Sequence, residues 1–310
     1  MIWLAFVARH GRWVLPAGLV IGTALPPLAR AMEPAIVPLL AFLLFLAALR
    51  IGPGAARPRP RELPRALMWT ALLQVVPPLI AIAVLGGLGW LAHPAALGVV
   101  LVLAASPITG SPGLAILSGA DPAPALRQLV LGTALLPLTA LPVFAFLPVF
   151  AAPGEVVAAT LRLLAVIGVA GAAAFLLRAR WPALGTGRGA VAIDGLTALA
   201  MGLVVIALTS ALGPALVSGD PALWPVLALV FVLNFGTQLG TLALTRAQGA
   251  GPRAPALAIV AGNRNLALFL AALPEPTAQA ILLFVGCYQV PMFLTPLLLA
   301  PLYRRLSDSS

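Results

Sequence analysis

Long stretches without a charged residue follow one another along almost the whole chain, and they limit the fold more than any other feature. Of the 310 residues, 62% are hydrophobic and only 8% are charged. A soluble domain is roughly 45–50% apolar and about 25% charged, which excludes an ordinary soluble enzyme. Because a helical membrane span takes about 20 apolar residues, we expect an integral membrane protein.

Arginine, proline and glycine divide the apolar sequence into ten candidate spans. The spans cover residues 13–29, 34–50, 66–90, 95–119, 125–150, 156–177, 191–212, 221–245, 255–273 and 277–302. These lengths leave no room for a separate soluble domain. The sequence therefore predicts an all-α polytopic membrane protein with ten transmembrane helices.

The arginines give this topology a direction, since the chain has eighteen basic residues and no lysine. With the N-terminus in the cytoplasm, fifteen of them fall on the inner side: Arg9, Arg12, Arg50, Arg57, Arg59, Arg61, Arg65, Arg127, Arg178, Arg180, Arg188, Arg246, Arg253, Arg304 and Arg305. Arg30 and Arg162 fall on the opposite side, and Arg264 lies inside a span. This bias predicts that both termini are cytoplasmic. The expected location is a bacterial inner membrane, and the net charge of +10 needs no nucleic-acid partner.

Two spans are interrupted by helix-breaking or polar residues about half a chain apart. Span four contains Thr109, Gly110, Ser111 and Pro112, and span nine contains Gly262, Asn263, Arg264 and Asn265. Five spans in each half would enter the membrane in opposite directions, which predicts an inverted five-plus-five repeat. Paired interruptions of this kind point to a transporter's binding site, so we predict that these eight residues bind the substrate.

Arg264 carries most of the chemical information. An arginine near the middle of a span costs about 2.5–3.5 kcal/mol on insertion scales, and such residues usually face a cavity and have a partner. No carboxylate or histidine falls in the middle of a predicted span, and Asp194, about one turn into span seven, is interpreted as a helix cap. A bound anion could therefore supply the missing counter-ion.

Gln74, Asn234 and Gln289 also lie inside spans and complete the predicted substrate-binding set, although for each residue taken alone a hydrogen bond between helices is the favoured interpretation. The sequence contains no phosphate loop, metal-ligand cluster or nucleophile–base pair, and its single cysteine is Cys287. We therefore expect no catalytic residues, no metal and no cofactor.

Three segments resemble motifs of the bile acid:sodium symporter family. Gln74-Val75-Val76-Pro77-Pro78-Leu79 is similar to the family's span-three Gln and Pro-Leu stretch. Ser106-Pro107-Ile108-Thr109-Gly110-Ser111-Pro112-Gly113, with Asp121 further on, resembles its span-four motif. Val260-Ala261-Gly262-Asn263-Arg264-Asn265 resembles its span-nine Glu-x-Gly-x-Gln-Asn motif.

This resemblance implies an inverted repeat in which the two broken helices cross. A panel domain would comprise about 13–50 and 156–212, and a core domain about 66–150 and 221–302. It also implies an organic-anion substrate, such as a bile acid or a related carboxylate, transported with sodium.

The chain departs from the family at the positions that would coordinate sodium. Val260 stands at the family's Glu, Arg264 at its Gln, and Pro112-Gly113 at its Ser-Asn pair. A sodium ion about 4 Å from a guanidinium would be repelled by roughly 4 kcal/mol at an effective dielectric constant near 20. We therefore predict that Arg264 replaces the coupling ion, by holding the crossing helices together, by attracting the anion, or both.

The leading hypothesis is a sodium-independent secondary transporter of a small organic anion, not an enzyme, working by alternating access. One alternative is a sodium- or proton-coupled organic-anion symporter of the same fold. An alternative of another class is a non-transporting membrane sensor, although the sequence offers no output domain. The oligomeric state and the substrate's identity stay open.

Overall fold

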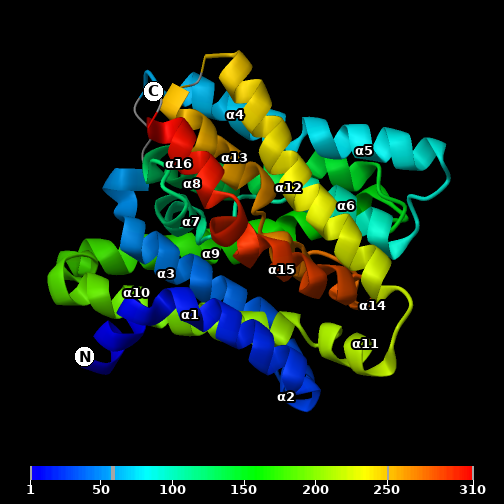
Figure 1. The fold of residues 1–310 in the computed structure, drawn as a ribbon, viewed down its shortest axis with the longest axis horizontal. Coiled ribbons are helices and arrows are strands. Elements are labelled where there is room, and N and C mark those ends of the chain that lie inside the picture. Colours follow the sequence, from blue (N-terminus) through cyan, green and yellow to red (C-terminus); the bar gives the residue numbers. More distant parts are fainter. Residues whose placement is uncertain (1, 57–59, 250, 309–310) are drawn as a thin grey trace.

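A computed structural model describes residues 2–56, 60–249 and 251–308, and in these ranges the fold consists of helices without strands. The α-helices are α1 (Ile2–Ala24), α2 (Pro26–Met32), α3 (Ile36–Ala56), α4 (Leu63–Gln74), α5 (Val76–Gly87), α6 (Pro94–Ala104), α7 (Ser111–Leu117), α8 (Pro122–Ala145), α9 (Pro153–Arg180), α10 (Gly187–Leu208), α11 (Leu212–Ser218), α12 (Leu223–Ala247), α13 (Ala254–Gly262), α14 (Glu275–Ala280), α15 (Leu282–Leu298) and α16 (Ala300–Asp308). Short 3-10 helices are η1 (Glu33–Ala35), η2 (Pro182–Gly185), η3 (Gly251–Arg253) and η4 (Leu266–Ala271). Figure 1 shows their arrangement.

The molecule is an all-α polytopic membrane protein. Among the described residues, six helical segments are long and apolar enough to cross a membrane: Pro26–Gly54, Leu63–Gly87, Pro122–Ala145, Pro153–Arg180, Gly187–Leu208 and Leu223–Ala247. The pair α15 and α16, bent by 48°, makes a seventh candidate. By this criterion ten spans are not shown. The predicted spans 13–29, 95–119 and 255–273 correspond to a shorter apolar helix, Trp13–Ala24, and to two interrupted segments.

Several helix boundaries follow from ordinary capping chemistry. Asp121 precedes Pro122 at the start of α8, and its Oδ1 accepts a hydrogen bond from the backbone N–H of Ala123 at 2.9 Å. His93 caps α6 in the same way, again with proline as the first helical residue. Proline suits that position because its missing N–H would have no helical partner there. Asp194, in contrast, does not cap α10, which begins seven residues earlier. It instead forms an ion pair with Arg50.

The arginines that define the predicted topology are not all described. Arg57 and Arg59 lie outside the described residues. Arg127 pairs with Glu62 at 3.0 Å. The cytoplasmic placement of both termini stays a prediction.

Helices α1, α3, α9 and α10 pack on one another, and α4, α8, α12, α13 and α15 pack together beside them. The contact between α1 and α10 depends on small residues, as is common between membrane helices. A Cβ atom at Gly22 would lie only 2.8 Å from the backbone of Ile206. Close approach of these two helices therefore requires glycine at that position.

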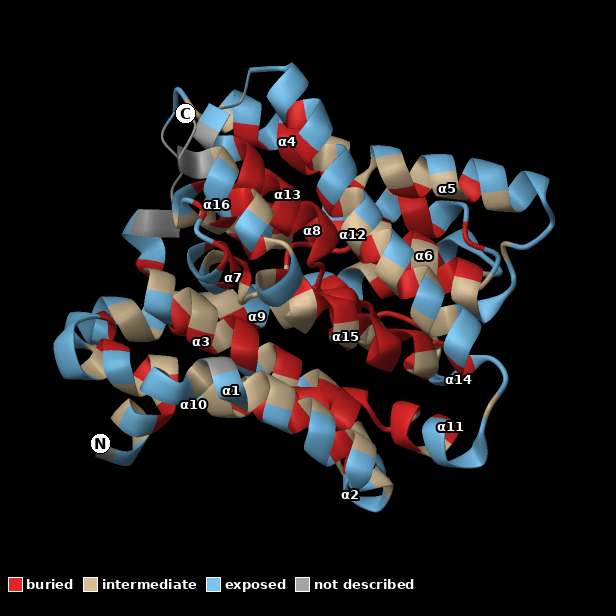
Figure 2. Ribbon diagram, in the orientation of Figure 1, coloured by how far each residue is buried: buried red, intermediate tan, exposed pale blue. Residues whose placement is uncertain are grey.

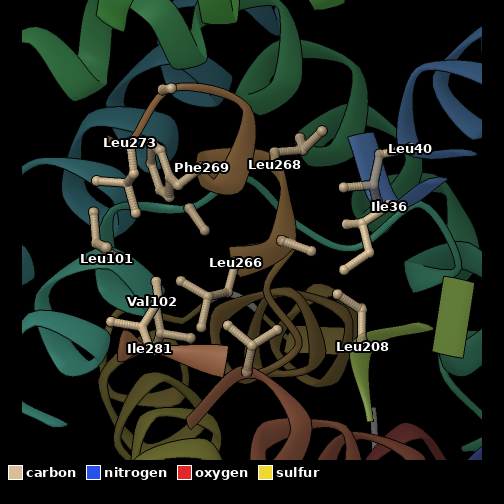
Figure 3. Close-up of a cluster of buried hydrophobic side chains, with 14 of the residues drawn as sticks. Ile36, Leu40, Leu101, Val102, Leu208, Leu266, Leu268, Phe269, Leu273 and Ile281 are labelled. Carbon is tan, nitrogen blue, oxygen red and sulfur yellow. The ribbon is translucent and has the colours of Figure 1, made fainter. Parts of the chain in front are cut away.

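The most thoroughly buried part of the molecule lies where the interrupted segments meet. All nine residues of α13 are buried, and Figure 2 shows this helix inside a shell of more exposed ones. Leucine and isoleucine side chains from α3, α6 and α10 surround η4 (Figure 3). This placement buries non-helical backbone in protein, away from lipid, as a bilayer demands.

We expect Gly22→Ala to destabilise the protein by about 1–3 kcal/mol, because the added methyl group overpacks the contact between α1 and α10. The measurement is thermal unfolding in detergent. Gly240→Ala in α12 is the control, since a Cβ there meets no atom within 4 Å. Equal melting temperatures of the two variants would contradict the close contact between α1 and α10.

Candidate functional site

Both predicted interruptions are present, and they pair with each other. The first separates α6 from α7, and the second separates α13 from η4. The backbone N–H of Ile108 donates to the carbonyl oxygen of Asn263 at 2.9 Å, and that of Asn265 donates to Ser106 at 2.8 Å. Pro107 and Arg264 form an isolated antiparallel bridge between these bonds. Two unwound segments, with bridged residues 157 positions apart in the sequence, thus form hydrogen bonds for part of each other's backbone.

We call the place where residues 106–108 and 263–265 meet the crossing. Arg264 lies there and is only 3% exposed. Its guanidinium donates hydrogen bonds to three backbone carbonyl oxygens: Nη2 to Leu73 and to Leu103, the latter at 2.9 Å, and Nη1 to Val260 at 3.5 Å. Its Nε, in the described part of the chain, has no partner. The side chain therefore joins three segments without any carboxylate contact.

Proline explains why two of these carbonyl groups are available. In an α-helix the carbonyl of Leu73 would accept from the N–H of residue 77, and that of Leu103 from residue 107. Both positions hold proline, which has no N–H to donate. The guanidinium thus fills two hydrogen-bonding vacancies that the sequence creates.

The same three carbonyls lie at the carboxyl ends of helices. Leu73 and Leu103 are one residue from the ends of α4 and α6, and Val260 is two residues from the end of α13. Helix carboxyl ends carry partial negative charge, which favours a cation. Arg264 therefore balances three helix dipoles in a buried place, which is how a charge without a counter-ion is stabilised here.

A network of buried polar side chains from α12 and α15 forms hydrogen bonds with the backbone at the end of α13, where the second interruption begins. Asn234 Nδ2 donates to the Gly262 carbonyl, which also accepts from the Tyr288 hydroxyl. Gln238 Nε2 donates to Asn234 Oδ1 at 2.7 Å and to Thr295 Oγ1 at 3.0 Å. These bonds fix the end of α13 against α12 and α15.

Asn263 and Gly262 belong to this network. Thr295 Oγ1 donates to Asn263 Oδ1 at 3.2 Å, and Asn263 Nδ2 donates to the Ile259 carbonyl at 2.8 Å. A Cβ at Gly262 would overlap the Gln238 side chain and the Asn234 carbonyl oxygen, so glycine is required there. Both residues therefore hold the end of α13 against α12 and α15.

A small cavity of about 30 Å³ lies between the crossing and helices α1, α3 and α10. Four of the predicted binding residues line it: Thr109, Arg264, Asn265 and Gln289. The other lining residues are apolar, among them Leu40, Met201 and Phe293. Since one water molecule occupies about 30 Å³ of liquid, an organic molecule does not fit until the surrounding helices separate.

The remaining predicted residues lie elsewhere. Ser111, the first residue of α7, donates from Oγ to the Ile108 carbonyl at 2.7 Å, and Pro112 follows it in the first turn. Gly110 faces the end of Met201, since a Cβ there would meet the Met201 Cε at 3.3 Å. Gln74 accepts a hydrogen bond from Thr139 at 3.0 Å. The structure thus does not gather all eleven predicted residues around one cavity.

Gln238, Thr139 and Thr295 were not in the predicted set, although each bonds to a residue that was. The sequence shows Gln238 as a polar residue within a span, but hydroxyl residues bonded to their own helix backbone are common in membranes and gave no signal.

A larger cavity of about 740 Å³ opens at one end of the molecule, between the α2–α3 connection, α9 and α14. Glu33, Glu155, Glu275 and Arg162 line it. Gln279 on α14 donates a hydrogen bond to Glu33 across this opening. The molecule therefore has a wide mouth at one end and a narrow centre.

No protein-family model matches the chain, and a search of curated proteins finds no significant match. The resemblance to bile acid:sodium symporters thus rests on the motifs in the sequence.

Replacing Arg264 with methionine should lower the free energy of unfolding by about 2–5 kcal/mol, because the Leu73 and Leu103 carbonyls would be left buried without donors. Thermal unfolding in detergent measures the change. Arg246→Met removes an exposed arginine and should leave stability within about 0.5 kcal/mol. Equal stability of the two variants would contradict the assigned role of Arg264.

Proposed function

We propose that the protein is a secondary transporter of a small organic anion that works by alternating access without sodium. Its ten spans would form an inverted five-plus-five repeat, as in the bile acid:sodium symporter family. Helices α1, α2, α3, α9 and α10 would form the panel domain, and α4–α8 with α12–α16 the core domain. The observation that carries the proposal is Arg264 at the crossing of two interrupted helices, beside a cavity between these two groups.

The charge around the cavity favours an anion. Arg264 carries a fixed positive charge, because a guanidinium stays protonated at any accessible pH. None of the described residues that line the cavity is acidic, and the carbonyl groups that hold Arg264 supply dipoles without net charge. The amide of Asn265 and the hydroxyl of Thr109 line the same cavity and add hydrogen-bonding groups next to this charge.

The contacts of Arg264 also support sodium independence. In transporters with discontinuous helices, unwound carbonyls and the carboxyl ends of half-helices coordinate sodium. Here the guanidinium occupies carbonyls of this kind at the ends of α4, α6 and α13. Because the guanidinium cannot dissociate, sodium would have no access to these carbonyl groups. The proposed transporter would therefore work as a uniporter or an exchanger.

The shapes of the two cavities fit an alternating-access cycle. The cavity at the mouth is wide, at about 740 Å³, while the one at the crossing is only about 30 Å³. The Gln279–Glu33 hydrogen bond joins the two helix groups at the mouth and would have to rearrange as they move. Substrate entry then requires the panel helices to separate from the crossing.

Uptake of a radiolabelled carboxylate by proteoliposomes tests the proposal. We expect the same rate with and without a sodium gradient, because no sodium site is free. Arg264→Gln should abolish uptake. A strong sodium dependence would remove the sodium-free mechanism, and full activity of Arg264→Gln would remove Arg264 from it.

Asn265→Ala and Gln289→Ala separate binding from folding. Each should reduce uptake by about tenfold, the loss expected for a hydrogen bond of roughly 1.4 kcal/mol, with little change in melting temperature. Thr160→Ala on α9, whose hydroxyl bonds only its own helix backbone, is the control and should transport normally. If both amide variants transport at the control rate, the cavity is not the substrate site.

The topology can be tested by cysteine labelling, because Cys287→Ser leaves a cysteine-free background. Gln248→Cys should react with a membrane-impermeant maleimide only after the membrane is opened, whereas Ala92→Cys should react in intact cells. Both positions are exposed loop sites in the structure. Labelling of both from the same side would contradict the ten-span topology.

A further inference from the structure

A second pocket, of about 170 Å³, lies at the amino ends of α4, α8 and α13 and shares no lining residue with the cavity at the crossing. Four arginines line it: Arg61, Arg65, Arg127 and Arg253. The only carboxylate among the described lining residues is Glu62, which pairs with Arg127 at 3.0 Å. The pocket therefore keeps an excess of three positive charges.

The backbone adds to this positive potential. Glu62 and Arg65 lie at the start of α4, Arg127 lies in the second turn of α8, and Arg253 immediately precedes α13. Three helix amino ends thus face one small pocket. A helix amino end carries about half a positive charge and can bind phosphate, sulfate or carboxylate groups. At α8 this charge is partly offset by the Asp121 carboxylate that caps the helix.

A buried donor without a partner lies in the same wall. Trp69 lines the pocket and is only 3% exposed, yet its indole Nε1–H has no hydrogen-bond partner among the described residues. A buried indole N–H usually finds an acceptor. An anion in the pocket would neutralise the arginines around it and would lie beside the indole ring that carries this N–H.

We propose that this pocket binds a phosphate group. Its volume of about 170 Å³ is large enough for one hydrated phosphate group. The guanidinium groups of Arg65 and Arg253 match phosphate oxygens in geometry as well as in charge. The phosphate could come from the head group of an anionic lipid or from free phosphate in solution.

The general excess of arginine at cytoplasmic ends does not account for this arrangement. That excess places arginines in loops without requiring a shared pocket. Arg246, which is predicted to lie on the same side, is exposed at the end of α12 and does not line the pocket. The convergence of arginines, helix amino ends and an unpartnered indole N–H is what indicates a ligand.

The experiment uses the full-length protein with ¹⁵N-labelled tryptophan in uncharged maltoside micelles. Trp69→Phe identifies the Trp69 indole resonance. Sodium phosphate is titrated at constant ionic strength against sodium chloride, and short-chain phosphatidylglycerol is added to separate micelles. We expect a saturable shift of the Trp69 resonance with at least one of the two probes and none with chloride.

Arg65→Gln and Arg253→Gln should each weaken the response about tenfold, whereas Arg246→Gln should leave it unchanged. A response to phosphate alone identifies a soluble ligand, and a response to phosphatidylglycerol, alone or with phosphate, identifies a lipid head group. The proposal is overturned if neither probe shifts the resonance saturably, or if Arg246→Gln weakens the response as much as the pocket variants do.

Discussion

The rest of the structure depends on the bonds between one guanidinium and three helix ends. Leaving the helical conformation inside a membrane exposes backbone groups that lipid cannot satisfy. Among the places where the chain does so are the ends of α4, α6 and α13, after Gln74, Ala104 and Gly262. Arg264 donates to a carbonyl next to each of these breaks, so one side chain compensates three interruptions. Its positive charge is in turn stabilised by the negative ends of the same helices.

The sequence predicts the locations of these breaks well because proline and glycine act locally. Pro77, Pro107 and the Gly262-Asn263 pair mark the interruptions before any tertiary contact is known. The membrane character also follows from composition alone. The predicted helix starts were less accurate: α1 begins at Ile2, eleven residues before the expected span, because a basic segment was interpreted as loop.

The partners of Arg264 could not be read from the sequence in the same way. Because no carboxylate falls in the middle of a predicted span, the sequence suggested a bound anion as the counter-ion of Arg264. The guanidinium instead donates to backbone carbonyl groups, which every residue has and which a sequence therefore does not reveal. Only the four-residue spacing from Leu73 to Pro77 and from Leu103 to Pro107 indicates a free carbonyl. Likewise, Asn234 is a candidate ligand in the sequence, whereas in the structure it bonds to the Gly262 carbonyl and to Gln238. Side-chain direction depends on which helices pack together, and a single sequence does not give that.

A fixed cation changes what the proposed transporter can do. A symporter couples two gradients because its ion must bind and leave in each cycle, so the two conformations differ in ion occupancy. A ligand shifts such an equilibrium only through its different affinities for the two states. Arg264 is covalently part of the chain, so its contribution to the crossing is present in both conformations and draws no energy from an ion gradient. In the proposed mechanism, the substrate's own gradient, or exchange for a second anion, would then provide the driving force. The cavity can also be small when it is empty. The Arg264 guanidinium, together with the hydrogen bonds of Asn234 and Tyr288 to the Gly262 carbonyl, holds the crossing together without an ion or a substrate.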